Sequence, residues 1–257
     1  MGSNVNLEEY AIKFLLYSYF KLTLNSDPES ILNSIVERAY QDATMQGAYN
    51  AKLSNLWGKK STLVNKETIK KEMLDLSAKA KQKSFEPLKN FVNELPSKDN
   101  YNIEHGNLCK EILTAYNDVN NKYNEYRRQC GHAVDNNIFT YGNAQKWVNM
   151  TMKYVLIIYA IFSKYNKHLF PNIKNTVSSL HVPIDSYIID VIKLPNTVKT
   201  WSNWDEKTYI EVQGYIKKKS DDAGNDPIIW EGDAWIEQAI KRNKAPKKST
   251  SIKKPQD

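Results

Sequence analysis

The carboxylate of Asp185 stands where the sequence predicts the first turn of a short helix. Pro183 can occupy the first helical position, where its missing amide leaves nothing unsatisfied, and apolar residues recur at helical spacing from Ile184 to Ile192. The helix dipole favours an acid in this turn by about 0.3–1 kcal/mol, so we expect Asp185 to be ionised at neutral pH. A fixed, ionised carboxylate can stabilise positive charge that develops during a reaction. The ordinary alternative is that Asp185 only satisfies the helix end.

A second candidate site lies around Gly142, which ends a loop just before another expected helix. Free backbone amides at a helix start bind phosphate readily, so Gly142 and Asn143 are candidate phosphate-binding residues. If Lys146 lies in the first turn of that helix, the positive end of the dipole lowers its pKa and makes its amine a better nucleophile. The alternative is a solvated lysine beside a tryptophan of the core.

Helices dominate the elements that must position these residues, and the sequence shows neither a persuasive set of strands nor an internal repeat. The segment 144–164 is apolar almost all round in its second half, which is typical of a helix at the centre of a bundle. Residues 165–182 read as a connector. We expect helices at about 7–23, 26–44, 65–82, 84–95, 107–130, 144–164, 183–192, 205–219 and 230–241.

These elements predict an all-α fold, a helical bundle. The 257 residues suffice for one large domain or two small ones. We expect a single helical domain over residues 1–240, and the alternative is two helical lobes at about 1–130 and 131–240 with a cleft between them. The chain has only nine glycines and nine prolines, a balance that suits long helices better than a many-stranded sandwich.

The positive charge of the chain is concentrated at its end. Seven basic residues and one acid fall within residues 241–257, so this stretch carries +6 of the total formal charge of +7. It also contains two prolines and almost no apolar residue, and we expect a disordered basic tail. Such tails touch phosphates without reading sequence. A tail that only adds solubility is the equal alternative.

The sequence offers no pattern for a metal or cofactor. Cys109 and Cys130 are the only cysteines, too few for a four-thiolate zinc or iron–sulfur site, and the four histidines lack a metal-ligand spacing. The longest apolar run, Val155 to Phe162, is far shorter than the about 20 residues that span a bilayer. With no basic-then-apolar leader in view, we expect a cytoplasmic protein with no cofactor, no metal and no membrane partner.

The segment from Gln145 to Lys153, followed after a buried helix by the segment from His181 to Asp185, resembles the helix-hairpin-helix DNA glycosylases. In that family a lysine opens the helix after the hairpin and a Pro-Val-Asp segment supplies the catalytic aspartate. The archaeal 8-oxoguanine glycosylase branch is most similar, over residues about 138–192. The resemblance implies that Asp185 is catalytic and that Lys146 is the matched lysine, with Lys153 as the alternative.

The resemblance also implies a substrate and a reaction. The partner would be double-stranded DNA with a modified base, bound by a monomer that flips the base out at a cost of a few kcal/mol. Cleavage of the glycosidic bond builds positive charge on the deoxyribose, which Asp185 would stabilise. Attack by Lys146 would form a Schiff base and permit strand scission, whereas hydrolysis would leave an abasic site. Both side chains should then face one cleft within about 10 Å of each other.

A flipped base also needs aromatic faces and phosphate contacts. Lys153 joins Gly142 and Asn143 as a candidate phosphate-binding residue. Trp230, Glu231 and Trp235 are expected to seal the last helix onto the bundle instead. The candidate base-binding residues, each of which has a place in the core as its alternative, are Tyr141, Trp147, Tyr187, Trp201 and Trp204.

The sequence does not identify the modified base. The nearest branch implies 8-oxoguanine, and a bulky phage-type modification such as glucosylated hydroxymethylcytosine is the second choice, which would place the protein in anti-phage defence. The alternative is a non-catalytic helical module that binds nucleic acid or protein. The basic tail and the polar 107–130 helix support this alternative. A helical enzyme that acts on free nucleotides is a third possibility.

Overall fold

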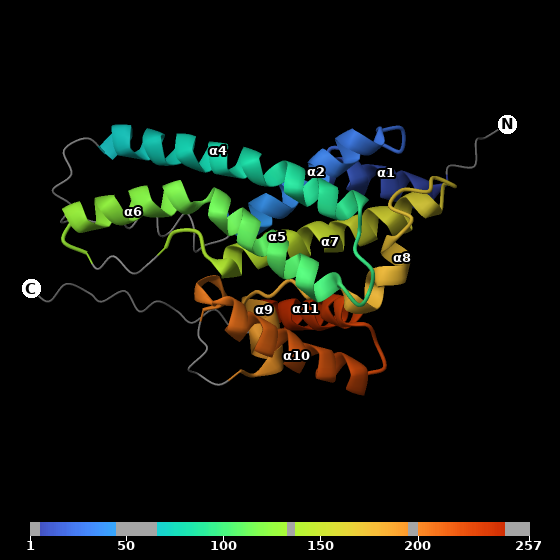
Figure 1. Cartoon of the computed structure of the whole chain (residues 1–257). Helices are drawn as coiled ribbons and strands as arrows, with labels where there is room; N and C mark the ends of the chain where they lie inside the picture. The colour runs from blue at the N-terminus through green and yellow to red at the C-terminus, as the bar shows by residue number, and fades with distance from the viewer. Residues whose placement is uncertain (1–5, 45–65, 133–136, 195–199, 245–257) are drawn as a thin grey trace, which may run out of the picture.

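All regular structure in the described part of the chain is helical, which confirms the all-α prediction (Figure 1). The structure is a computed structural model that describes residues 6–44, 66–132, 137–194 and 200–244. Short 3-10 turns cover Val177–Ser179 and Trp201–Asn203. The α-helices are α1 (Leu7–Phe20), α2 (Pro28–Thr44), α4 (Lys66–Asn93), α5 (Tyr101–Ala115), α6 (Asn117–Gln129), α7 (Tyr141–Ser163), α8 (Ile173–Thr176), α9 (Ser186–Ile192), α10 (Glu206–Asp222) and α11 (Pro227–Lys244).

Helix α7 lies at the centre of the bundle, as its apolar composition predicts. Helices α1, α2 and α4 lie on one side of it, and α9, α10 and α11 lie on the other (Figure 1). Helix α2 packs most extensively against α7, and α5 also contacts it. Trp147, Val148, Met152, Ile158 and Phe162 of α7 are fully buried. Residues 141–149 of α7 are buried on every side, whereas Ile157 and Ala160 in the apolar second half are exposed. The central place of α7 therefore depends mainly on its first half.

One helix stands where the sequence predicts two. Residues 65–82 and 84–95 were expected to form separate helices with a start at Ser84, but α4 runs without a break from Lys66 to Asn93. The hydroxyl of Ser84 donates to the carbonyl of Ala80 at 2.9 Å, so the buried serine is satisfied inside the helix and does not cap a new one. The expected cap at Asn65 lies outside the described residues.

The opposite correction applies to the expected helix 107–130, which the structure divides into α5 and α6. The break falls at Tyr116, whose amide bonds to the carbonyl of Leu113 in a tight turn at 3.1 Å. The Tyr116 ring is fully buried and stacks on Phe139 with the ring centroids 3.7 Å apart. This contact joins residues far apart in the chain, so local helix periodicity gives no sign of it.

The last helix is longer than predicted at both ends. Helix α11 begins at Pro227 and continues through Lys244, so the first four residues of the expected tail 241–257 are helical. Arg242 explains this extension, because its guanidinium pairs with Asp190 at 2.6 Å and donates to the carbonyl of Ser186 at 2.7 Å. The remainder of the expected tail, residues 245–257, lies outside the described residues.

Gly142 allows α7 to touch the 3-10 turn that precedes α10. A Cβ at this position would lie 2.1 Å from the carbonyl oxygen of Trp201. We therefore expect Gly142→Ala to lower the free energy of unfolding by about 3 kcal/mol, because the backbone itself must move. Urea unfolding measures this loss.

Gly214→Ala is the matched control. Gly214 is an exposed residue of α10 with no atom within 4 Å of an added Cβ, and alanine there should stabilise by about 0.5–1 kcal/mol. Equal effects of the two substitutions would contradict the close approach at Gly142.

Candidate functional site

A pocket with a volume of about 650 Å³ opens between α1, α2, α7, α11 and the segment 180–185. It gathers six charged side chains from four different parts of the chain beside apolar lining residues. The charged lining residues are Arg38, Asp42, Lys146, Lys153, Asp185 and Glu231, and the other lining residues include Leu15, Tyr19, Phe20, Tyr154, Pro183 and Trp235.

Asp185 is the N-cap of α9, which corrects the prediction that it lies inside the first turn after Pro183. Its backbone is extended, and the helix begins one residue later at Ser186. One oxygen, Oδ1, accepts hydrogen bonds from the amides of Tyr187 at 2.8 Å and Ile188 at 3.1 Å. The helix end therefore holds the carboxylate, as expected, but it does so by capping.

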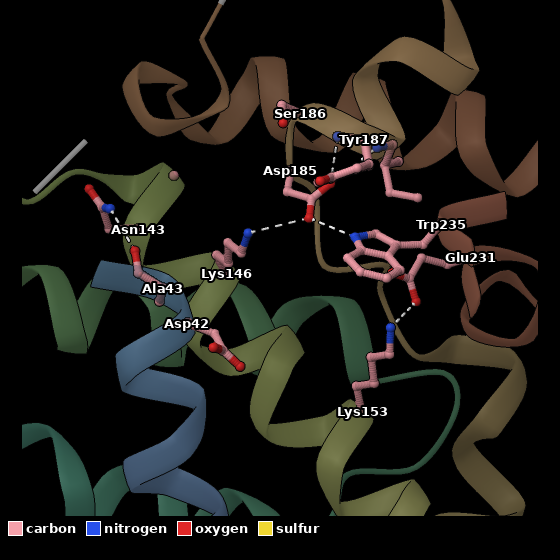
Figure 2. Close-up of polar contacts among 12 residues, drawn as sticks. Asp42, Ala43, Asn143, Lys146, Lys153, Asp185, Ser186, Tyr187, Glu231 and Trp235 are labelled. Carbon is pink, nitrogen blue, oxygen red and sulfur yellow. Dashed lines mark hydrogen bonds and ion pairs between the residues drawn. The ribbon is translucent and has the colours of Figure 1, made fainter. Parts of the chain in front are cut away.

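The second oxygen of Asp185 faces the pocket. It accepts a hydrogen bond from the indole Nε1 of Trp235 at 3.0 Å and lies 3.9 Å from the Nζ of Lys146 (Figure 2). The expectation that Asp185 and Lys146 face one cleft is therefore confirmed. The separation from Lys146 is wider than a hydrogen bond, so the carboxylate attracts the ammonium without engaging it fully.

Lys146 projects from the second turn of α7, not the first, because the helix already begins at Tyr141. Its side chain is only 9% exposed, and its Nζ lies 4.6 Å from the centre of the Trp201 ring. Burial lowers the pKa of Lys146, and the nearby carboxylates of Asp185, Asp42 and Glu231 oppose that shift. A lowered pKa of Lys146 was expected from the helix dipole, but its main cause is burial.

Lys153 and Glu231 form a second charged pair in the pocket. The Nζ of Lys153 lies 2.6 Å from the Oε2 of Glu231, whose side chain is 2% exposed (Figure 2). Burial raises the pKa of Glu231, and the Lys153 ammonium offsets part of the shift. Lys153 therefore lies at the pocket beside a carboxylate, and its contact with a DNA phosphate stays a prediction.

Glu231 and Trp235 were expected only to seal α11 onto the bundle, yet both line the pocket. Their spacing of four residues places them on one face of the helix. A signal was therefore present in the sequence, since an acid and an indole one turn apart are well suited to bind a planar polar ligand. Which face of α11 turns inward could not be read from the sequence, because both faces carry apolar residues.

The opposite wall of the pocket comes from α2, which the sequence analysis did not consider. The hydroxyl of Tyr154 donates to Asp42, and the Nη2 of Arg38 lies 3.2 Å from the other oxygen of that carboxylate. The hydroxyl of Tyr19 lies 2.7 Å from that of Tyr154. Only the packing of α1 and α2 against α7 brings Asp42 to the site, so no local pattern marks it.

The start of α7 is not open to a phosphate, which corrects the assignment of Gly142 and Asn143. Thr140 and Asn143 form a capping box. The Thr140 side chain accepts a hydrogen bond from the Asn143 amide, and the Asn143 side chain accepts one from the Thr140 amide at 3.1 Å. The hydroxyl of Thr140 donates to the carbonyl of Ser202 at 2.5 Å. Because Gly142 is buried under the 201–203 turn and the Asn143 amide bonds back to Thr140, neither amide can reach a ligand.

The predicted aromatic residues divide into core and neighbours of the pocket. Tyr141, Trp147 and Trp204 are buried away from it, which corrects their assignment as base-binding residues. The Trp147 indole is satisfied by the carbonyl of Val36 at 3.0 Å. Trp201 and Tyr187 do not line the pocket but contact residues that do. The Trp201 ring lies under Lys146, and the centroids of the Tyr187 and Trp235 rings are 5.0 Å apart.

Two buried histidines lie behind the segment that carries Asp185. The rings of His105 and His181 are 4.5 Å apart. His105 bonds to Asn149 at 2.8 Å, and His181 bonds to Tyr209 at 2.7 Å and Asn102 at 2.8 Å. Burial lowers the pKa of His105 to about 4, and burial together with the neighbouring His105 lowers the pKa of His181 well below its ordinary value.

Within the described residues, no group of three or more potential ligand side chains gathers in a way that could hold a metal ion. None of the helices described there has both the length and the apolar character needed to cross a membrane. No family model, curated protein or solved structure matches this chain. Its function must therefore be inferred from the geometry of the pocket.

The two histidines predict a loss of stability in mild acid. Both are neutral in the folded protein, and the unfolded chain binds protons below about pH 6.5. The unfolded state therefore holds more protons, and the free energy of unfolding should fall by about 1.4 kcal/mol per pH unit for each histidine as the pH drops from about 6.5 toward 4. Urea unfolding at pH 7.0, 6.0 and 5.0 measures the slope.

The variant His132→Asn serves as the control, because His132 is exposed. It should show the same slope as the parent protein. A stability that stays level between pH 7 and 5 would show that His105 and His181 are not held neutral.

Proposed function

We propose that this protein is a DNA N-glycosylase that excises an oxidised purine, of the 8-oxoguanine kind, from double-stranded DNA. The observation that carries the proposal is the buried Lys146 ammonium 3.9 Å from Asp185, at the wall of a pocket of about 650 Å³. Pockets of about 300–1,000 Å³ are the size that holds a small planar ligand. A flipped base can enter it and bring its sugar to the two side chains at the wall.

Asp185 has the properties that glycosidic cleavage needs. When the bond between C1′ and the base breaks, the electron pair leaves with the base and the sugar becomes an oxocarbenium-like cation. A carboxylate that is already fixed by the α9 amides and Trp235 stabilises that charge without having to reorganise. Water or an amine then attacks C1′ from the open side of the pocket.

Lys146 is the candidate amine. Its lowered pKa increases the fraction of neutral, nucleophilic Nζ at neutral pH. If it attacks C1′ as the nucleobase leaves, a carbon–nitrogen bond forms at C1′. The C1′–O4′ bond then breaks, which opens the ring to a protonated Schiff base, and a proton released from Nζ ends on O4′. Strand scission by β-elimination can follow. If water attacks instead, the product is an abasic site, and Lys146 acts only through its charge.

The remaining polar groups suit an oxidised purine. Glu231 provides a hydrogen-bond acceptor and Lys153 a donor, 2.6 Å apart, and Trp235 contributes an aromatic ring to the same pocket. Oxidation at C8 of guanine creates a new N7–H donor and a new O8 acceptor, which match such a pair. The support therefore favours 8-oxoguanine among the two candidate bases.

The rival proposal is a non-catalytic helical module. The charged pocket does not favour it, because burying Lys146 and Glu231 and holding four half-buried charged groups beside them is costly, and a surface that only binds phosphates has no need of this arrangement. The two proposals differ in one product, since only the enzyme converts modified DNA into DNA with abasic sites.

Asp185→Asn should abolish base excision. Asparagine still caps a helix but lacks the negative charge, and we expect the single-turnover rate on duplex DNA with 8-oxoguanine to fall at least about 100-fold, equivalent to about 2.7 kcal/mol on the barrier. Cleavage of the product by hot alkali reveals the abasic sites.

Asp190→Asn is the matched control for this loss. Asp190 is exposed on the same helix, is absent from the pocket lining, and pairs with Arg242. Its substitution should leave the rate within about twofold of the parent protein. An intact strand after incubation of the parent protein with a broad panel of modified bases would favour the binding module.

Lys146→Gln should abolish a covalent adduct that borohydride traps on DNA carrying an abasic site. Because the neutral amine is the nucleophile, the yield of trapped adduct from the parent protein should rise with pH. It should level off at a pH below the ordinary lysine pKa of about 10.4. Gel electrophoresis of the trapped complex measures the yield.

Lys164→Gln is the control, since Lys164 is an exposed residue at the end of α7. Loss of the adduct in Lys153→Gln, with full trapping in Lys146→Gln, would reassign the nucleophile. Absence of an adduct in the parent protein, together with alkali-labile product, would restrict Lys146 to an electrostatic role.

A further inference from the structure

The segment 180–185 places Asp185, yet it belongs to no helix and has no strand beside it. Its central residue, Val182, is held by two side-chain amides. The Val182 N–H donates to the Oε1 of Gln213 at 3.1 Å, and its carbonyl accepts from the Nε2 of Gln213 at 2.7 Å and from the Nδ2 of Asn149 at 3.0 Å. Gln213 thus bonds to both backbone groups of one residue, as a neighbouring strand would.

Neither amide can easily turn to another partner. Gln213 is 7% exposed, and Asn149 is fully buried. The Oδ1 of Asn149 bonds to His105 at 2.8 Å, and its Nδ2 also lies 2.9 Å from the Oε1 of Gln145. A buried polar group that loses its partner costs about 1–3 kcal/mol, so the network favours a single arrangement.

The link from Val182 to the catalytic oxygen is short and stiff. Pro183 has a fixed φ and lines the pocket, and Ile184 is fully buried. Asp185 follows directly, so any movement of Val182 is transmitted to its carboxylate. A displacement of about 1 Å at a reacting group can reduce a rate about 100-fold.

We propose that Gln213, from a helix that contributes nothing to the described pocket lining, is a positioning residue that sets the place of the Asp185 carboxylate through Val182. Asn149 supports the same carbonyl from α7. The consequence for base excision rests on the proposed glycosylase function. The geometric consequence, a displaced Asp185 when Gln213 is changed, does not depend on it.

Gln213→Glu tests the proposal through pH. The ionised glutamate keeps an acceptor for the Val182 N–H but turns a negative oxygen toward the Val182 carbonyl, whereas the protonated form can donate to that carbonyl as glutamine does. Relative to the parent protein at the same pH, we expect the single-turnover rate to fall about 100-fold at pH 8 and to recover toward the parent rate at pH 5. Binding of duplex DNA should change less than about threefold, since the pocket lining is intact.

A second readout reports the position of Asp185 without any catalysis. The indole N–H of Trp235 bonds to Asp185, so its resonance in protein labelled with ¹⁵N-tryptophan should shift in Gln213→Glu at pH 8 and return at pH 5. Trp235→Phe identifies the resonance. Gln129→Glu, an exposed substitution on α6, adds the same charge and should change neither rate nor resonance.

Gln213→Asn is the second variant, because it keeps the amide acceptor and donor on a side chain shorter by one carbon. It should remain folded, shift the indole resonance and lower the rate at every pH. If the parent protein excises no base but the resonance shifts as described, the proposed function fails and the positioning role stands. If the resonance stays in place in both variants, the positioning role is overturned, whatever the rates.

Discussion

One oxygen of the Asp185 carboxylate caps a helix and the other faces the pocket, and the rest of the site depends on this arrangement. Oδ1 caps α9, and Oδ2 faces Lys146 and Trp235 in the pocket. Because the helix end fixes the first oxygen, the second cannot rotate away to satisfy itself elsewhere. A buried ammonium is then held beside a carboxylate that it does not fully neutralise, which is a costly arrangement unless a ligand uses it.

The charges in the pocket are balanced in number but supplied from distant parts of the chain. Asp42 and Arg38 come from α2, Lys146 and Lys153 from α7, and Glu231 from α11. Each buried charge needs a partner of opposite sign, because isolation in an apolar surrounding costs several kcal/mol. The pocket can therefore form only when α2 and α11 have packed on opposite sides of α7, so the proposed chemistry is coupled to the completed fold.

Local patterns predicted much of the secondary structure and part of the site. The apolar second half of α7 predicted a central helix. The shared cleft of Asp185 and Lys146 was implied only by the resemblance that their two segments carry. The division of α5 from α6 could not be predicted, because the stacking of Tyr116 on Phe139 decides it. The continuity of α4 through Ser84 was missed because a serine can cap a helix or bond back within one, and burial selects between the two.

By itself, the sequence determined that the described chain is helical, that α7 lies at the centre of the bundle, and that an acid stands at the start of a short helix after Pro183, since each of these depends on residues close together in the chain. Only the tertiary structure decided which charged groups meet. It buried Gly142 under the 201–203 turn, turned Trp147 into the core, and brought Asp42, Glu231 and Trp235 to the pocket. The physical reason is that periodicity defines the faces of a helix, whereas the choice of the face that each neighbour covers depends on packing across the whole molecule.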